Sequence, residues 1–253
     1  MTEGANARVA VVTGAGSGIG RATAFALAAG GVSVAVAERP DRISRAREVV
    51  AEIHERGGRA IDLPLEVTAT YTLPPAFEHV ADVLGGLDIL VNNAGVQLIK
   101  PALDYDEDEF DAIMDVNLKG AFFCAQAAAA IMKARGNGRI VNIASQHGVV
   151  GNVDRAVYCA SKGGLINLTR ALAVEWAPLG ILVNSVSPSF VITDENRLLY
   201  ATSGASDQVE AFMPIKRAIE PDEVASAVVY LSSVASRSIT GHNLVVDGGW
   251  TAR

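Results

Sequence analysis

The amino-acid sequence predicts an α/β fold: a doubly wound sheet of seven parallel strands with helices on both faces, in a single domain of residues 1–253. Short apolar runs alternate with longer helical segments along the chain, which is typical of right-handed β-α-β crossovers. The apolar runs are nearly continuous, as in strands buried on both faces. Neither a repeat nor a polar linker divides the chain.

The expected strands are seven runs rich in Val, Ile and Leu. They cover residues 8–13, 32–37, 59–63, 87–92, 139–145, 181–187 and 243–247. Helical patterns are found at residues 18–29, 41–56, 118–135, 156–177 and 220–233. The least regular stretch, residues 189–215, is polar and long for a connection. We interpret it as an excursion that forms a binding loop, because long loops in compact domains often do so.

Composition and charge exclude several classes of function. The net charge is -7 and no run of Lys or Arg is present, which argues against nucleic acid and membrane surfaces as partners. The two cysteines, Cys124 and Cys159, form no disulfide framework. No signal peptide or long apolar span is recognisable, so the expected location is the cytoplasm. The four histidines lack metal-ligand spacing, and we expect no metal.

A glycine-rich turn joins the first expected strand to the first expected helix. Gly14, Gly16, Gly18 and Gly20 lie within the segment TGAGSGIG at residues 13–20. Glycines there permit a tight turn and a close approach of a pyrophosphate, whose charge the helix N-terminus favours. The strand–turn–helix context predicts a dinucleotide-binding site.

The second expected strand leads into Glu38 and Arg39. A carboxylate at this place accepts hydrogen bonds from the adenosine ribose and repels a 2′-phosphate, which favours NAD. Arg39 favours NADP instead, because a guanidinium can hold that phosphate. We expect NAD as the preferred cofactor and NADP as the alternative.

A second group of polar residues predicts acid/base chemistry. Tyr158 and Lys162 are four residues apart at the start of a helical segment, so they share one helix face. A nearby ammonium favours the phenolate, which would lower the pKa of Tyr158 and make it a usable general acid/base. Ser145 ends the fifth expected strand, and Asn117 is expected to start the helix after the fourth. Parallel sheets place ligand sites at this edge.

With these motifs the chain resembles the short-chain dehydrogenase/reductase family over essentially its whole length. The TGxxxGxG pattern of that family matches residues 13–20, its NNAG pattern matches residues 92–95, and its catalytic tetrad matches Asn117, Ser145, Tyr158 and Lys162. The resemblance implies a Rossmann-type fold and an NAD(P)-dependent oxidoreductase that moves a hydride to or from a secondary alcohol carbon. It also implies a homotetramer, with residues 125–130 and the helix from Ala156 in the dimer-forming pair.

The same resemblance implies roles for individual residues. Tyr158 would exchange a proton with the substrate oxygen, Ser145 would hydrogen-bond that oxygen, Lys162 would hold the nicotinamide ribose, and Asn117 would support a water relay. The chain departs from the family after the sixth strand, where Pro188-Ser189 replaces the usual Pro-Gly, and at Glu66, where Asp is usual. The cofactor would contact Gly14, Ser17, Gly18, Ile19, Gly20, Glu38, Arg39, Glu66, Val67, Asn93, Ala94, Gly95, Tyr158, Lys162, Pro188, Val191 and Thr193.

Three further residues bear on the substrate. Gln97, His147 and Arg155 are expected beside Ser145 and Tyr158 at the mouth of the pocket, where they could hold a carboxylate. This set is similar to that of D-3-hydroxybutyrate dehydrogenases, so we expect a small 3-hydroxy or 3-oxo carboxylate as the substrate. Asp194 and Glu195 oppose an anion if they face the same pocket.

Other functions remain open at this point. The alternatives within the family are a dehydrogenase of sugars, polyols or sugar acids and a reductase of 3-oxoacyl thioesters. A non-catalytic dinucleotide sensor is a remote alternative, because Asn117, Ser145, Tyr158 and Lys162 are all present.

Overall fold

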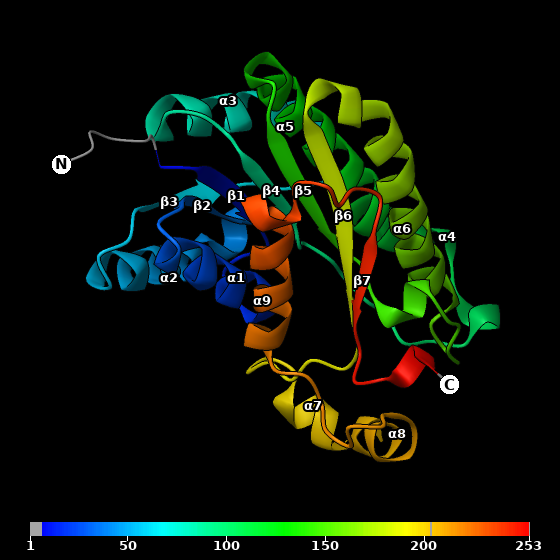
Figure 1. Cartoon of the computed structure of the whole chain (residues 1–253). Helices are drawn as coiled ribbons and strands as arrows, with labels where there is room; N and C mark the ends of the chain where they lie inside the picture. Colours follow the sequence, from blue (N-terminus) through cyan, green and yellow to red (C-terminus); the bar gives the residue numbers. More distant parts are fainter. Residues whose placement is uncertain (1–6, 203, 253) are drawn as a thin grey trace.

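A computed structural model describes residues 7–202 and 204–252, which form a seven-stranded parallel sheet covered by helices on both faces (Figure 1). The strand order is β3-β2-β1-β4-β5-β6-β7, and every pairing is parallel. The chain therefore starts at the centre of the sheet, builds one half outward, returns to the centre and builds the other half. The predicted fold class is confirmed.

The strands all lie within one or two residues of their predicted positions. They are β1 (Val9–Thr13), β2 (Ser33–Glu38), β3 (Ala60–Pro64), β4 (Ile89–Asn92), β5 (Gly138–Ile143), β6 (Ile181–Pro188) and β7 (Asn243–Val246). Two end positions differ in a way that matters for the site. Glu38 is the last residue of β2, and Ser145 lies beyond the end of β5.

The helices pack in two layers against the sheet. They are α1 (Gly18–Ala29), α2 (Ile43–Glu55), α3 (Leu73–Leu84), α4 (Glu107–Met114), α5 (Ala121–Arg135), α6 (Ala156–Trp176), α7 (Arg197–Thr202), α8 (Ala205–Phe212) and α9 (Pro221–Ser232). One buried apolar cluster joins α1, α2 and α9 to one face, and another joins α3, α5 and α6 to the opposite face. Figure 1 shows the two layers on either side of the strands.

The middle of the chain corrects one prediction. Asn117 does not start a helix, because it lies within a π-helical segment, Asp115–Gly120, that connects α4 to α5 without a break. Such π-helical segments are often found at functional sites. Helix α3 was not predicted, since its first turn contains Pro74 and Pro75, which resemble a loop in sequence but are tolerated where no intrahelical N–H is needed.

The predicted excursion at residues 189–215 is not irregular throughout, because it carries α7 and α8. The chain before α7 and the chain after α8 are joined by a parallel bridge between Val191 and Ile219, and the Ile219 N–H donates to the Phe190 carbonyl at 2.8 Å. In Figure 1 these two helices lie below the carboxyl ends of the strands. Within the described ranges, no helix has the length and apolar character that a bilayer crossing requires.

The glycine turn after β1 depends on backbone shapes and distances that side chains would disturb. Gly14 and Gly18 have φ values of +60° and +53°, in the left-handed region. A Cβ on Gly20 would lie 2.3 Å from the Gly14 carbonyl oxygen and 2.5 Å from Asn93 Nδ2. Gly20 therefore allows helix α1 to pack directly on the turn.

We expect Gly20→Ala to destabilise the protein by about 1–3 kcal/mol, the usual cost of forcing extra atoms into a packed region. Urea unfolding monitored by circular dichroism measures this loss. Gly151→Ala is the matched control, because a Cβ there meets no atom within 4 Å. Equal midpoints for the two variants would show that the turn has more room than the structure indicates.

Candidate active site

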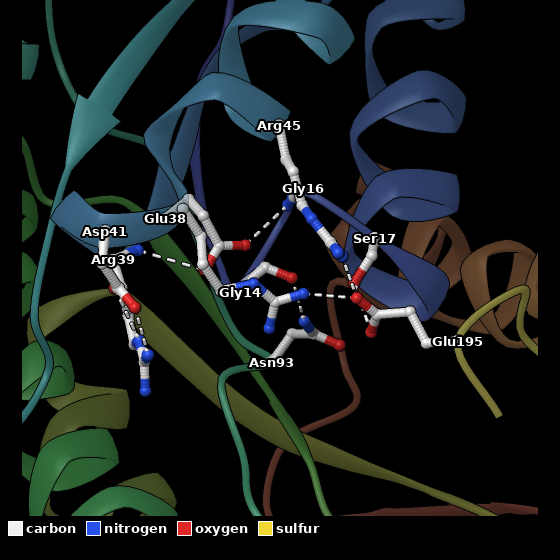
Figure 2. Close-up of polar contacts among 10 residues, drawn as sticks. Gly14, Gly16, Ser17, Glu38, Arg39, Asp41, Arg45, Asn93 and Glu195 are labelled. Atoms are coloured by element: carbon white, nitrogen blue, oxygen red, sulfur yellow. Dashed lines mark hydrogen bonds and ion pairs between the residues drawn. The ribbon is translucent and has the colours of Figure 1, made fainter.

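The strand order reverses between β1 and β4, and open parallel sheets form their ligand crevice at the carboxyl ends of the strands at such a point. Thr13 and Asn93 hold the two strand ends together there. The Thr13 hydroxyl accepts the N–H groups of Asn93 and Ala94, both at 3.0 Å. Asn93 Nδ2 donates to the Thr13 carbonyl at 2.9 Å. It also donates to the Gly14 carbonyl at 2.9 Å (Figure 2).

A cavity of about 560 Å³ opens beside this junction and fits the adenosine half of a dinucleotide. Gly20 does not line it and acts through packing. The predicted cofactor residues that do line it are Gly14, Ser17, Gly18, Ile19, Glu38, Arg39, Glu66, Val67, Asn93, Ala94, Gly95 and Thr193. The structure thus gathers, from five separate segments, residues that the sequence assigns to one cofactor.

Glu38 is buried at the end of β2, with its carboxylate directed at the glycine turn (Figure 2). One carboxylate oxygen accepts the Gly16 N–H and the other accepts the Arg39 N–H, each at 3.1 Å. A carboxylate oxygen can accept more than one hydrogen bond. Glu38 can therefore still accept the ribose hydroxyls, as its position in the cavity wall requires.

The neighbouring arginines are already paired with carboxylates. Arg39 makes two hydrogen bonds to Asp41, at 2.6 and 3.1 Å, to one side of the turn (Figure 2). Arg42 and Arg45 both form ion pairs with Glu195, which also accepts a hydrogen bond from the Ser17 hydroxyl at 3.0 Å. Glu195 comes from the 189–215 excursion, so this carboxylate links the excursion to the cofactor cavity.

A second cavity, of about 340 Å³, continues from the first and shares Ile19, Asn93, Gly95, Val96 and Thr193 with it. It contains the residues predicted for chemistry and substrate. Its walls include Gln97, Ser145, His147, Arg155, Tyr158, Lys162, Pro188 and Val191. The structure therefore brings together every predicted substrate residue and three members of the predicted tetrad.

Helix α6 is fixed against the sheet by buried polar contacts. Lys162 Nζ donates to the Ile143 carbonyl at the end of β5, at 2.8 Å. Further along the helix, Asn142 Nδ2 donates to the Thr169 hydroxyl at 2.9 Å. These contacts set the position of Tyr158, one turn before Lys162, relative to Ser145.

The electrostatics around Tyr158 differ from the prediction. Surrounding protein atoms remove water from the hydroxyl and raise the pKa of Tyr158, while a hydrogen bond with Ser145 and the charge of Arg155 oppose that rise. Burial lowers the pKa of Lys162 to about 8. The predicted lowering of the Tyr158 pKa by Lys162 is wrong for this arrangement, because desolvation of the phenol outweighs the neighbouring charges.

Asn117 is buried and lines neither cavity. Its Oδ1 accepts the Val96 N–H at 2.8 Å, and its Nδ2 donates to the Val96 carbonyl at 2.9 Å and to the Ser161 hydroxyl at 3.0 Å. Both ends of the carboxamide are thus occupied. The side chain ties α6 to the loop after β4, which is a positioning role.

His147 follows Ser145 by two residues in the short helix Gln146–Gly148, which the Ser145 hydroxyl caps by accepting the His147 N–H at 3.1 Å. Burial and the nearby Arg155 lower the pKa of His147 to about 4. The imidazole is therefore neutral near pH 7, so it offers a hydrogen bond to a ligand but no positive charge.

Arg155 is only 7% exposed, although its side chain lines the substrate cavity. Its Nη1 donates to the Val153 carbonyl at 3.2 Å, and no carboxylate in residues 7–202 or 204–252 forms an ion pair with it. The acids expected to repel an anion lie elsewhere. Asp194 has a 98% exposed side chain, and Glu195 faces Arg42 and Arg45.

Several further residues line the substrate cavity and were not predicted, among them Gln146, Phe190, Asn196 and Tyr200. Phe190 contacts His147 edge-on, with ring centroids 6.1 Å apart, and packs on Trp250 near the end of the chain at 5.5 Å. Gln146 could have been found from its place directly after Ser145. The others depend on how the excursion folds back, which no local pattern indicates. Among the described residues, no cluster of His, Cys, Asp or Glu could hold a metal ion.

The depressed pKa of His147 predicts a loss of stability in acid. Between about pH 6.5 and 4 the unfolded chain binds a proton at His147 that the folded chain excludes, so folding stability falls as the pH falls. The expected loss by pH 5 is on the order of 2 kcal/mol. Melting temperatures at pH 7 and pH 5 should therefore differ more for the wild type than for His147→Gln. The exposed His79 supplies the control, and a His147→Gln curve parallel to the wild type and to His79→Gln would refute the assignment.

Comparison with known proteins gives the family. A family model described as enoyl-(acyl carrier protein) reductase matches residues 14–251. The NAD-dependent glycerol dehydrogenase of Listeria innocua is 37% identical, over 97% of this chain and 94% of its own. The D-beta-hydroxybutyrate dehydrogenase of Rhizobium meliloti is 36% identical, over 97% of this chain and 99% of its own.

Solved structures agree with these relatives. A gluconate 5-dehydrogenase from Burkholderia cenocepacia, in complex with NADP and tartrate, superposes with a TM-score of 0.92. It is 34% identical, and the alignment covers 97% of this chain and 96% of that one. The chain therefore belongs to the short-chain dehydrogenase/reductase family, and it is an NAD(P)-dependent oxidoreductase that acts on alcohols and ketones.

Proposed function

We propose that this enzyme interconverts a small hydroxy carboxylate and the corresponding oxo carboxylate, with 3-hydroxy acids as the best candidates. The observation that carries the proposal is Arg155. A buried guanidinium without a counter-ion is costly, whereas the same group beside a bound carboxylate gains charge-assisted hydrogen bonds. Arg155 lines the same cavity as Ser145 and Tyr158, so one small ligand could contact all three.

The size of the cavity supports a small substrate. Its 340 Å³ is near the lower end of ligand-site volumes, and the predicted nicotinamide contacts Pro188, Val191 and Thr193 line the same space. Little room then remains for the substrate itself. This favours a compact acid over the acyl chain of a thioester.

The chemistry follows from four side chains that line the cavity: Ser145, Arg155, Tyr158 and Lys162. When bound, the dinucleotide accepts or supplies the hydride. During oxidation the phenolate oxygen of Tyr158 takes the hydroxyl proton, and during reduction the phenol returns it. Ser145 hydrogen-bonds the substrate oxygen, and the charge of Arg155 favours the phenolate. Lys162, fixed through Ile143, would hold the nicotinamide ribose.

The relatives are consistent with an acid but do not decide between acids and polyols. One relative is named a D-beta-hydroxybutyrate dehydrogenase, and one similar solved structure is a gluconate 5-dehydrogenase in complex with NADP and tartrate. The glycerol dehydrogenase points to a neutral polyol instead. Arg155 is the feature of this chain that favours the acid.

We also propose that NAD is preferred to NADP. The buried Glu38 carboxylate faces the site of the adenosine ribose, where it would repel a 2′-phosphate. The nearby cations are already neutralised, since Asp41 binds Arg39 and Glu195 binds both Arg42 and Arg45. A phosphate would have to compete with these carboxylates.

A homotetramer in the cytoplasm is the proposed state of the enzyme. Most alanines at residues 125–130 are buried within the chain itself and pack in its core, so they do not form the contact directly. An apolar groove between α5 and α6 supports association better. Its lining includes Leu118, Phe122, Phe123, Gly164 and Leu168.

Arg155→Met should reduce kcat/KM for D-3-hydroxybutyrate about 10- to 100-fold more than for its methyl ester, because a charged hydrogen bond contributes about 1.5–3 kcal/mol. The readout is the ratio of the kcat/KM values for the acid and the ester. Loss of the charge also affects Tyr158, but that effect is the same for both substrates and cancels in the ratio. Arg155→Lys should keep part of the preference for the free acid. An unchanged acid-to-ester ratio in Arg155→Met would overturn the carboxylate assignment.

Glu195→Gln should raise the ratio of kcat/KM with NADP to kcat/KM with NAD by roughly 10-fold, because it releases Arg42 and Arg45 to bind a phosphate. Initial rates with the two cofactors measure this ratio. Asp194→Asn is the matched control, since Asp194 does not line the cofactor cavity. A ratio that stays the same in Glu195→Gln would show that Glu195 has no part in cofactor choice.

A further inference from the structure

Gln146 is the most unusual polar side chain in the substrate cavity. It directly follows Ser145, is 1% exposed and lines the same cavity as Tyr158 and Arg155. Neither its Oε1 nor its Nε2 has a hydrogen-bond partner among the residues that the structure describes. A fully buried carboxamide with both ends unpaired destabilises a folded protein, so its presence needs a reason.

Two other buried amides have both ends paired within the protein. Asn117 uses both ends on Val96 and Ser161. Asn184 donates to the Ile239 carbonyl at 2.8 Å and accepts the His242 N–H at 3.0 Å. Both belong to the scaffold. Gln146 differs because it lines the substrate cavity and neither end of its amide is paired within the described residues.

Backbone hydrogen bonds fix the position of Gln146 in the wall of the cavity. Its carbonyl accepts the N–H groups of Val149 and Val150, both at 2.9 Å, in the short helix after β5 that Ser145 caps. The start of the side chain is therefore fixed next to the reacting centre. A ligand in the cavity is the natural partner for an amide held in this way.

We propose that Gln146 determines specificity by binding a second hydroxyl of the substrate, next to the carbon that reacts. A carboxamide offers a donor and an acceptor, and a hydroxyl both accepts and donates, so one such group can satisfy the amide. The substrate class is then a polyhydroxy acid rather than a simple hydroxy acid. This inference rests on the proposed function, since it takes the carboxylate to lie on Arg155 and the reacting oxygen on Ser145 and Tyr158.

A site that is built to hydrogen-bond a substrate hydroxyl discriminates strongly against the analogue that lacks it, because its own polar groups then stay unpaired. We expect the wild type to use 3,4-dihydroxybutyrate or 2,3-dihydroxybutyrate with a kcat/KM at least about 10-fold above that for 3-hydroxybutyrate. All of these carry a free carboxylate, so Arg155 contributes equally to each.

Gln146→Met keeps the length of the side chain and removes its hydrogen bonds. It should bring the ratio of dihydroxy to monohydroxy acid close to one, and it should raise the melting temperature of the protein without substrate. Gln126→Met, at an exposed position of α5, is the matched control and should change neither. Preference for the monohydroxy acid in the wild type, or an unchanged ratio in Gln146→Met, would overturn the proposal.

Two further results distinguish this inference from a role of Gln146 in cofactor binding and from a failure of the proposed function. If Gln146→Met raises the KM for NAD and leaves the substrate ratio unchanged, the amide serves the nicotinamide and the inference is wrong. If esters or neutral polyols are used in place of free acids, the proposed function itself fails, and Arg155→Met shows this independently of Gln146.

Discussion

The junction between β1 and β4 is the constraint on which the site depends. The sheet order reverses there, and the Thr13 hydroxyl with the Asn93 side chain binds the two strand ends and the glycine turn into one unit. Because Gly14 and Gly20 carry no side chain at this closely packed junction, α1 can begin directly over the crevice. The cofactor cavity and the substrate cavity both open from this unit.

Charge is distributed unevenly along that crevice. At the adenosine end, Glu195 and Asp41 neutralise the available arginines, and the buried Glu38 adds a negative charge. At the catalytic end, Arg155 is buried without an ionic partner among the described residues, and His147 is neutral. The two ends are thus suited to different ligands: a ribose without a phosphate at one, and an acid at the other.

The sequence was informative where one local pattern determines the outcome. The glycine turn, the YxxxK helix face and the continuous apolar strands identified the fold and placed Ser145, Tyr158, Lys162 and Arg155 around one cavity. It was less informative where tertiary packing decides. Three features of the site depend on groups that are distant in sequence. They are the hydrogen bonds of Asn117, the raised pKa of Tyr158, and the ion pairs of Glu195 with Arg42 and Arg45. The helices of the excursion were missed because their polar sequence resembles a loop.

The most direct test is NAD reduction by the purified protein with free hydroxy acids, their methyl esters and neutral polyols, in parallel with Tyr158→Phe. The account predicts turnover of free acids, weak or no turnover of the esters and polyols, and a loss of about 100- to 10,000-fold in Tyr158→Phe with NADH binding retained. Turnover of polyols or esters with none of the acids would contradict the role of Arg155. Full activity in Tyr158→Phe would contradict the site itself.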